Sequence, residues 1–152
     1  MHVMNKYIDT YKAAIAALED YCAMQQIIDT TDQQIKDAYN AVTSVSSARL
    51  DGMPHAPNPR GGEDRIAATL DKVDAYRQRY VQAREYMDWF LPAWGALSEE
   101  DRWVLDTFFL AADDVSQEER VRAIADHFYV ERSTAHTKKS RAVRRLASAL
   151  FG

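Results

Sequence analysis

The chain has 152 residues, a hydrophobic fraction of 47% and a formal net charge of −4, which fits one domain or one small domain with an extended helical part. Its apolar runs are only a few residues long, which argues against a membrane span or a secretory signal, and its one cysteine excludes a disulfide framework within the chain. Six of its nine Gly and Pro residues lie between Gly52 and Gly62, so long runs elsewhere are free of helix breakers. We therefore expect an all-α protein of the reducing cytoplasm.

Residues 1–43 predict a long N-terminal helix. Thr31 with Gln34 fits a capping box that would interrupt it, but we expect one continuous helix with a weak point there. Apolar side chains recur at alternating three- and four-residue steps, as in the seam of a coiled coil, so Cys22 is expected to be buried. The predicted seam comprises Ile8, Tyr11, Ile15, Leu18 and Cys22 and continues less regularly through Met24, Ile27, Ile28, Ile35, Tyr39 and Val42.

Residues 44–62 predict a linker loop, because three prolines and several turn-forming residues exclude regular structure in its second half. Residues 63–95 predict a second helix, which Pro92 ends or kinks. The loop allows a reversal, so we expect the two long helices to form an antiparallel hairpin. The apolar side of the second helix comprises Ile66, Leu70, Val73, Tyr76, Tyr80, Met87, Phe90 and Leu91.

Residues 97–152 predict three shorter helices. Ser98 can cap the first of them, and Ser116 with Glu119 forms a capping box at the start of the second. Asp113 and Asp114 fall between these helices without a third metal ligand in register, and we expect them to be solvated. The expected inward side chains of the two helices are Trp103, Val104, Leu105, Phe108, Phe109, Val121, Ile124, Ala125 and Phe128.

The last predicted helix begins between Glu131 and Ser133 and runs to about Leu150. Its expected buried stripe is Ala135, Ala142, Val143, Leu146 and Leu150. Its other faces carry short polar and basic side chains, a composition that suits entry into the major groove of double-stranded DNA. The candidate DNA-binding residues are Arg132, Ser133, Thr134, His136, Thr137, Lys138, Lys139, Ser140, Arg141 and Arg144.

Charge is distributed unevenly along the chain. From Arg120 to Gly152 there are eight Lys or Arg against two acids, whereas residues 1–119 carry 11 basic and 21 acidic residues. A charge count alone is more typical of a solvated helix face. The arrangement of the basic residues on one helix favours a nucleic-acid partner.

The C-terminal sequence is similar to the fourth conserved region of bacterial sigma factors. Four segments carry this resemblance: residues 97–105 (LSEEDRWVL), the Ile124-Ala125 pair, residues 130–134 (VERST) and residues 141–146 (RAVRRL). The whole chain resembles small sigma-region-four-like regulators of phages and prophages, of the ArpU or RinA late-transcription type, which also have a Met-Pro pair in the interhelical loop (here Met53-Pro54).

This resemblance implies a helix-turn-helix that binds specific DNA sequences and regulates transcription, with RNA polymerase as a further partner. We expect the helical hairpin to form a homodimer or to bind the polymerase. The sequence departs from the family pattern at the turn, where Tyr129 replaces the usual Gly and Glu131 the usual Ser cap. A residue with a positive φ costs about 1 kcal/mol or more unless it is Gly, so we expect a reshaped turn with Ser133 as the cap. Lys138 stands at a usually apolar position, where its stem can pack while its amine reaches a phosphate.

Two other interpretations stay open from the sequence. A small terminase subunit of a DNA-packaging machine also combines a helix-turn-helix with long helices, and a helical adaptor could use the basic helix to meet an acidic protein. An enzyme is not expected, because the four His residues have no metal-ligand spacing and no glycine-rich phosphate loop follows a strand. No catalytic residue, cofactor or metal is expected.

Overall fold

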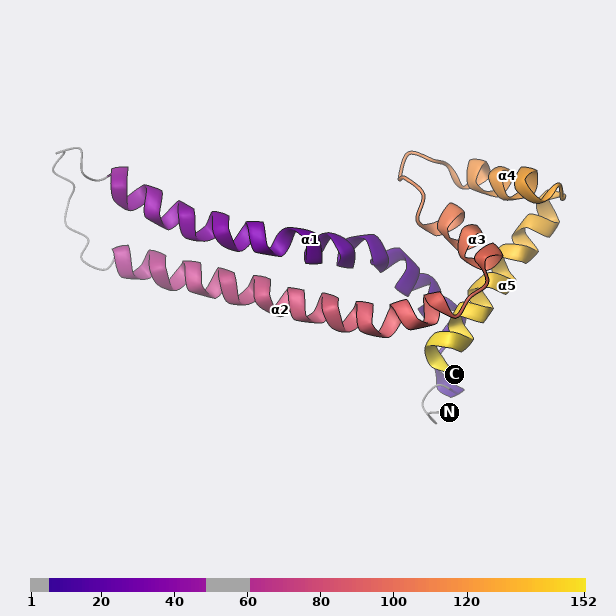
Figure 1. Ribbon diagram of the computed structural model, residues 1–152, viewed down its shortest axis with the longest axis horizontal. Coiled ribbons are helices and arrows are strands. Elements are labelled where there is room, and N and C mark those ends of the chain that lie inside the picture. The colour runs from indigo at the N-terminus through magenta and orange to yellow at the C-terminus, as the bar shows by residue number, and fades with distance from the viewer. Residues whose placement is uncertain (1–5, 49–60) are drawn as a thin grey trace. The chain divides into compact units, whose positions relative to one another are not determined.

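The computed structural model describes residues 6–48 and 61–152, and all regular secondary structure in these ranges is helical (Figure 1). This confirms the all-α prediction for the described residues. None of the helices described is long and apolar enough to cross a membrane. The helices are α1 (Thr10–Ala48), α2 (Gly61–Gly95), α3 (Glu99–Phe109), α4 (Gln117–Phe128) and α5 (Arg132–Phe151).

The chain divides into two compact units. The first combines the start of α1, up to Ala23, with everything from Tyr86 onward, and the second spans Met24–Glu85. Most of the predicted linker, including Met53-Pro54, lies outside the described residues.

Helix α1 extends beyond the predicted end at residue 43. Thr43 and Ser44 lie inside the helix, where their hydroxyls donate to the carbonyls of Tyr39 and Ala41.

The first unit has a core to which all five helices contribute. An aromatic cluster joins α1 to α2: the ring of Phe90 lies 5.5 Å from that of Tyr21 and 5.4 Å from that of Tyr86. The hydroxyl of Tyr86 donates a hydrogen bond to the carbonyl of Ala17, and burial raises its pKa, which keeps it protonated as a donor. The largest fully buried side chains of this unit are Leu18, Phe90, Val104, Leu105, Ile124, Val143 and Leu146.

Two predicted N-terminal caps are confirmed. The Ser98 hydroxyl accepts from the backbone N–H of Asp101 at 3.1 Å. The Ser116 hydroxyl accepts from the Glu119 N–H, and the Glu119 carboxylate accepts from the Ser116 N–H at 2.9 Å, which completes the capping box. These hydrogen bonds hold the pKa of Glu119 below its usual range.

Arg120, at the start of α4, fixes the connection from α3. Its guanidinium donates to the carbonyls of Phe108, Ala112 and Val115, at 2.8, 3.1 and 3.1 Å. These carbonyls belong to the last turn of α3 and the loop that follows, where they have no partner within a helix. Arg120 therefore satisfies the backbone of the loop and is not available as a surface charge.

In the second unit, the remaining parts of α1 and α2 bury small and medium side chains. Thr31 and Ala38 of α1 and Val73 and Ala83 of α2 are buried, with Val73 fully so. Helix α1 is continuous through Thr31, as expected. The Thr31 hydroxyl donates to the carbonyl of Ile27 four residues earlier, so this residue extends the helix and does not cap a new one.

The buried faces of the two long helices differ from the predicted seams. Cys22 is exposed, and the prediction that it is buried is wrong. Helix α1 turns Ala14 and Ala17 inward together with Leu18, which moves the buried face by about one position and leaves Cys22 outside it. Alanine contributes little to a seam defined by large side chains, but it allows two helices to approach closely.

Helix α2 also departs from the predicted apolar side. Ile66, Leu70 and Leu91 are about half exposed, so placing them in the seam is wrong, whereas Val73, Met87 and Phe90 are buried as expected. Pro92 does not end the helix, which continues to Gly95. The buried residue Ala93 follows Pro92 directly, and this packing holds the last turn in place despite the lost N–H donor.

We predict that Arg120→Ala will lower the free energy of unfolding by about 2–3 kcal/mol, because three loop carbonyls lose a charged donor. Urea denaturation followed by circular dichroism measures this change. Arg122→Ala is the matched control, since Arg122 is exposed on the same helix, and it should change stability by less than about 0.5 kcal/mol. Equal effects of the two substitutions would contradict the role given to Arg120.

Candidate nucleic-acid interface

A turn of three residues connects α4 to α5. Tyr129 adopts the left-handed conformation, with φ 53° and ψ 46°, and is 96% exposed. The N–H of Val130 donates to the carbonyl of Ala125 at 3.0 Å, and that of Tyr129 to the carbonyl of Asp126 at 3.4 Å. This pair of bonds is the Schellman arrangement that ends many helices. The turn therefore has the backbone geometry for which glycine is usual.

The expectation of a reshaped turn is wrong, because Tyr129 accepts the positive φ. The expected Ser133 cap is wrong too. Helix α5 begins at Arg132 with Glu131 as its N-cap, and Glu131 makes no side-chain capping bond. The Schellman bonds at the end of α4 fix the direction of the chain, so α5 starts before Ser133 is reached.

Helix α5 buries one stripe and exposes the other. Ala135, Ala142, Val143 and Leu146 are buried as predicted, Leu150 is half-buried, and Ala147 joins them. Most of the candidate DNA-binding residues are exposed: Arg132, Ser133, Thr134, His136, Thr137, Arg141 and Arg144. The other three, Lys138, Lys139 and Ser140, are half-buried.

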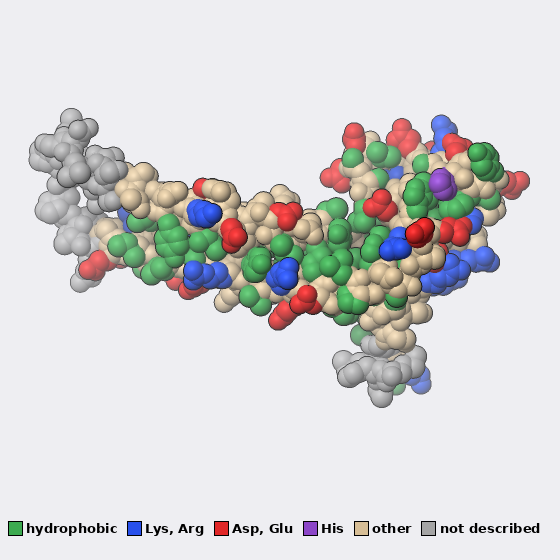
Figure 2. Space-filling model, viewed as in Figure 1, with side chains coloured by type: hydrophobic (Ala, Val, Ile, Leu, Met, Phe, Trp, Pro, Cys, Tyr) green, Lys and Arg blue, Asp and Glu red, His purple; other side chains and the backbone are tan. Residues whose placement is uncertain are grey.

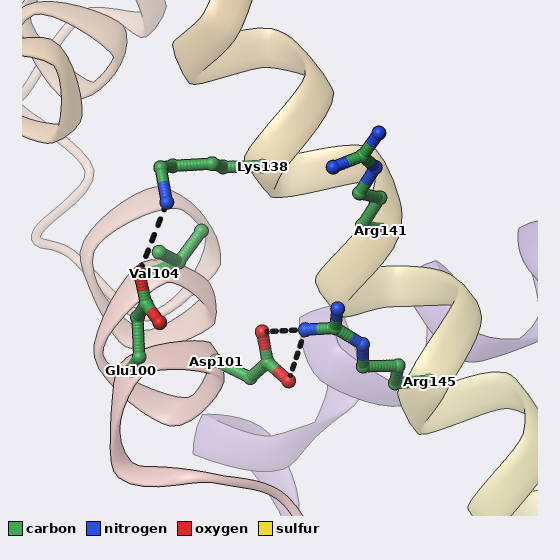
Figure 3. Close-up of a pocket in the computed structure, with 6 residues that line it drawn as sticks. All are labelled: Glu100, Asp101, Val104, Lys138, Arg141 and Arg145. Carbon is green, nitrogen blue, oxygen red and sulfur yellow. Dashed lines mark hydrogen bonds and ion pairs between the residues drawn. The ribbon is translucent and has the colours of Figure 1, made fainter. Parts of the chain in front are cut away.

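Two acids at the start of α3 bind basic side chains of α5 (Figure 3). Arg145 donates to both carboxylate oxygens of Asp101, at 2.7 and 2.8 Å, and these hydrogen bonds raise the pKa of Arg145. Lys138 donates to a carboxylate oxygen of Glu100 at 3.0 Å. The two acids differ in burial, because 9% of the Asp101 side chain is exposed against 55% of the Glu100 side chain. The Arg145 side chain is itself 60% exposed, so this pair joins α3 to α5 at the surface.

Three further candidate residues have partners within the chain. Arg132 pairs with Glu118 at 3.2 Å, and both side chains are well exposed. The ammonium of Lys139 lies 4.3 Å from the centre of the Phe108 ring, a cation–π contact. Ser140 accepts a hydrogen bond at 3.5 Å from the hydroxyl of Tyr11, at the start of α1.

Arg141 and Arg144 differ from these residues, because they are exposed and form no hydrogen bond or ion pair with the described part of the chain. Figure 3 shows Arg141 on the same side of α5 as Lys138 and Arg145, with no acid beside its guanidinium. Figure 2 shows Lys and Arg side chains gathered over the middle of α5. On α5, Arg141 and Arg144 are thus unpaired within the described chain, whereas the other basic side chains of the helix have partners there: Arg132, Lys138, Lys139 and Arg145.

Sequence reasoning missed the two acids that limit this surface. In the sequence, Glu100 and Asp101 stand out only as part of the segment LSEEDRWVL, which carries the resemblance to sigma factors. Lys138 lies 38 positions after Glu100, and Arg145 lies 44 after Asp101, so no local pattern connects them. The Lys138 stem is partly buried as expected, but its amine binds a carboxylate in the structure.

The described residues contain no group of three His, Cys, Asp or Glu side chains placed to hold a metal ion. In comparisons with protein-family models, curated proteins and solved structures, the chain has no significant match.

We predict that Tyr129→Gly will raise the free energy of unfolding by about 0.5–1 kcal/mol. Glycine removes the roughly 1–2 kcal/mol that a left-handed backbone conformation costs other residues. Part of this gain is offset, because glycine also increases the conformational entropy of the unfolded chain. Tyr129→Ala is the control, because alanine keeps the Cβ atom and the strain. Chemical denaturation of the three proteins tests this, and an alanine variant as stable as the glycine variant would show that the turn is unstrained.

Proposed function

We propose that this chain is a sequence-specific DNA-binding regulator of transcription that inserts α5 into the major groove. The observation that carries the proposal is the exposed face of α5, where Arg141 and Arg144 have no partner in the described chain and which also carries the short polar side chains of Ser133 and Thr137. Short side chains let a helix backbone approach base edges, and unpaired arginines supply donors to phosphates and guanines.

The way in which α5 is held supports this proposal. A recognition helix has to be rigid along its buried side and open along the other. The Schellman turn after α4, the Arg145–Asp101 pair and the buried side chains of Ala142 and Leu146 hold α5 on α3 and α4. In a helix-turn-helix, the helix that enters the groove is supported in this manner by the helix before it.

We propose further that α3 to α5 form a sigma-region-four-like domain. In the sequence, α1 and α2 precede this domain, and we propose that they form a helical hairpin. In such a regulator of phage or prophage type, surfaces away from α5 would contact RNA polymerase. The contacts between α1 and α2 at Tyr86 and Ala17 and at Tyr21 and Phe90 are compatible with a hairpin.

Selection of binding sites from random double-stranded DNA with the purified chain tests the proposal most directly. Enrichment of a common sequence motif is the expected result. If the chain retains DNA but enriches no motif, it binds DNA without sequence specificity. If it retains no DNA at about 50 mM salt, the proposal is overturned. An adaptor for an acidic protein would give the last outcome.

We predict that the double substitution Arg141→Gln and Arg144→Gln will lower DNA affinity roughly 50-fold at about 0.1 M salt, through the loss of two phosphate or base contacts. The slope of log K against log salt should become less negative by about 2. Fluorescence anisotropy with the selected site measures both quantities. The double substitution Arg65→Gln and Arg84→Gln removes the same two charges from exposed positions of α2 and serves as the control, and an equal loss in this variant would indicate a general charge effect.

We predict that Glu100→Gln will raise DNA affinity about fivefold at low salt, because Lys138 is then free to bind a phosphate. Glu99→Gln removes the same charge one residue earlier, from a side chain without an ion pair in the described chain, and should change affinity less than about twofold. Anisotropy titrations of the two variants under identical salt conditions separate the two effects. Equal gains would show that Lys138 is not released.

A further inference from the structure

Helix α2 carries exposed apolar side chains in the unit formed by Met24–Glu85. Ile66, Leu70 and Val81 are 52%, 48% and 54% exposed, whereas Val73 of the same helix is fully buried. Figure 2 shows hydrophobic side chains over the first half of α2. Single exposed apolar residues are common on protein surfaces, but several on one face of a helix indicate a surface that a partner covers.

These side chains form one stripe with two charged residues. At about 100° per residue, positions 66, 70, 74, 77 and 81 fall within an arc of about 80° on the helix. The charged members are Asp74 and Arg77, which are exposed and form no ion pair with the described part of the chain. A shallow hollow of about 410 Å³ adjoins the stripe, lined by Arg77, Gln78, Val81, Gln82 and Glu85.

The stripe is complementary to itself when two copies run antiparallel. Around a two-fold axis between positions 75 and 76, Leu70 of one copy faces Val81 of the other at the hollow, and Asp74 of one copy faces Arg77 of the other. A two-fold axis repeats each contact, so one such pairing buries four apolar side chains and forms two ion pairs. The exposed side chains of α2 thus supply both an apolar and a charged match.

Neighbouring two-fold registers do not have this match. An axis at position 74 places the Asp74 carboxylates of the two copies opposite each other, and an axis at position 77 does the same with the Arg77 guanidinium groups. Like charges directly opposite each other are destabilising. These two registers are therefore less favourable than the one centred between positions 75 and 76.

We propose that the chain forms an antiparallel two-fold dimer through this face of α2, with Leu70, Asp74, Arg77 and Val81 at its centre. A single pair of helices buries less than about 1,200 Å² of surface, and interfaces of this small size are typical of weak, reversible complexes. We therefore expect a dissociation constant in the micromolar range. The proposal does not depend on DNA binding.

A charge exchange between copies tests the dimer. Asp74→Arg places two arginines opposite each other at each contact, and Arg77→Asp places two aspartates there. Either variant should weaken dimerisation at least tenfold. An equimolar mixture of the two variants should form a heterodimer with affinity near that of the wild type, because both of its contacts then join an arginine to an aspartate. An ion pair within one helix cannot produce this rescue.

Sedimentation velocity between about 1 and 200 µM, without nucleic acid, measures the three samples, and native mass spectrometry identifies the heterodimer. Asp71→Arg lies on α2 outside the stripe and should dimerise as the wild type does. Leu70→Asn, which removes the apolar contact, should also weaken dimerisation at least tenfold. Circular dichroism verifies that each variant is helical.

A wild-type chain that stays monomeric at 200 µM would overturn the proposal, as would single variants that dimerise normally or a mixture that stays monomeric. A larger ring of copies would overturn it too. Since the samples contain no DNA, none of these outcomes bears on the proposed DNA binding, and loss of DNA binding would not affect the dimer.

Discussion

The pairing of Asp101 with Arg145 is the interaction on which the placement of α5 depends. The carboxylate of Asp101 is buried, and a buried charge is tolerated only when a partner of opposite charge and hydrogen bonds compensate its desolvation. Arg145 provides both, because one of its guanidinium nitrogens donates to the two carboxylate oxygens at 2.7 and 2.8 Å. Because Asp101 also lies in the first turn of α3, the pair joins this turn to α5 and acts together with the buried stripe of α5. In this orientation Leu146 lies in the core and Arg141 and Arg144 lie outside it.

Contacts within the chain also occupy many of the basic side chains of the C-terminal region. The count of eight basic residues from Arg120 onward suggests a strongly cationic surface. In the structure, Arg120 binds backbone carbonyls, Arg145 and Lys138 bind acids of α3, and Arg132 binds Glu118. Much of the charge therefore holds the helices together. A nucleic acid would meet a small unpaired centre, and specificity would depend on few contacts.

The features predictable from the sequence are those that local chemistry determines. The Ser98 cap and the Ser116–Glu119 capping box each involve residues three positions apart, and both are present. The buried stripe of α5 follows from helical spacing. The contacts of the candidate site are different, because the Lys138–Glu100 pair depends on how α3 and α5 pack. Tyr129 shows the same limit: its left-handed conformation is unfavourable locally, and the packing of α4 and α5 imposes it.

Helix α2 shows why apolar periodicity alone misplaced some side chains. A helix that pairs along one seam needs about two apolar residues in every seven, and Val73, Ala83, Met87 and Phe90 occupy that seam. Ile66, Leu70 and Val81 are apolar residues beyond those that the seam requires, and the helix exposes them on a second face. A single predicted side that combined both sets therefore mixed two surfaces. Since an exposed apolar stripe favours association in water, a helix with two such faces is suited to pair twice, once within its own chain and once outside it.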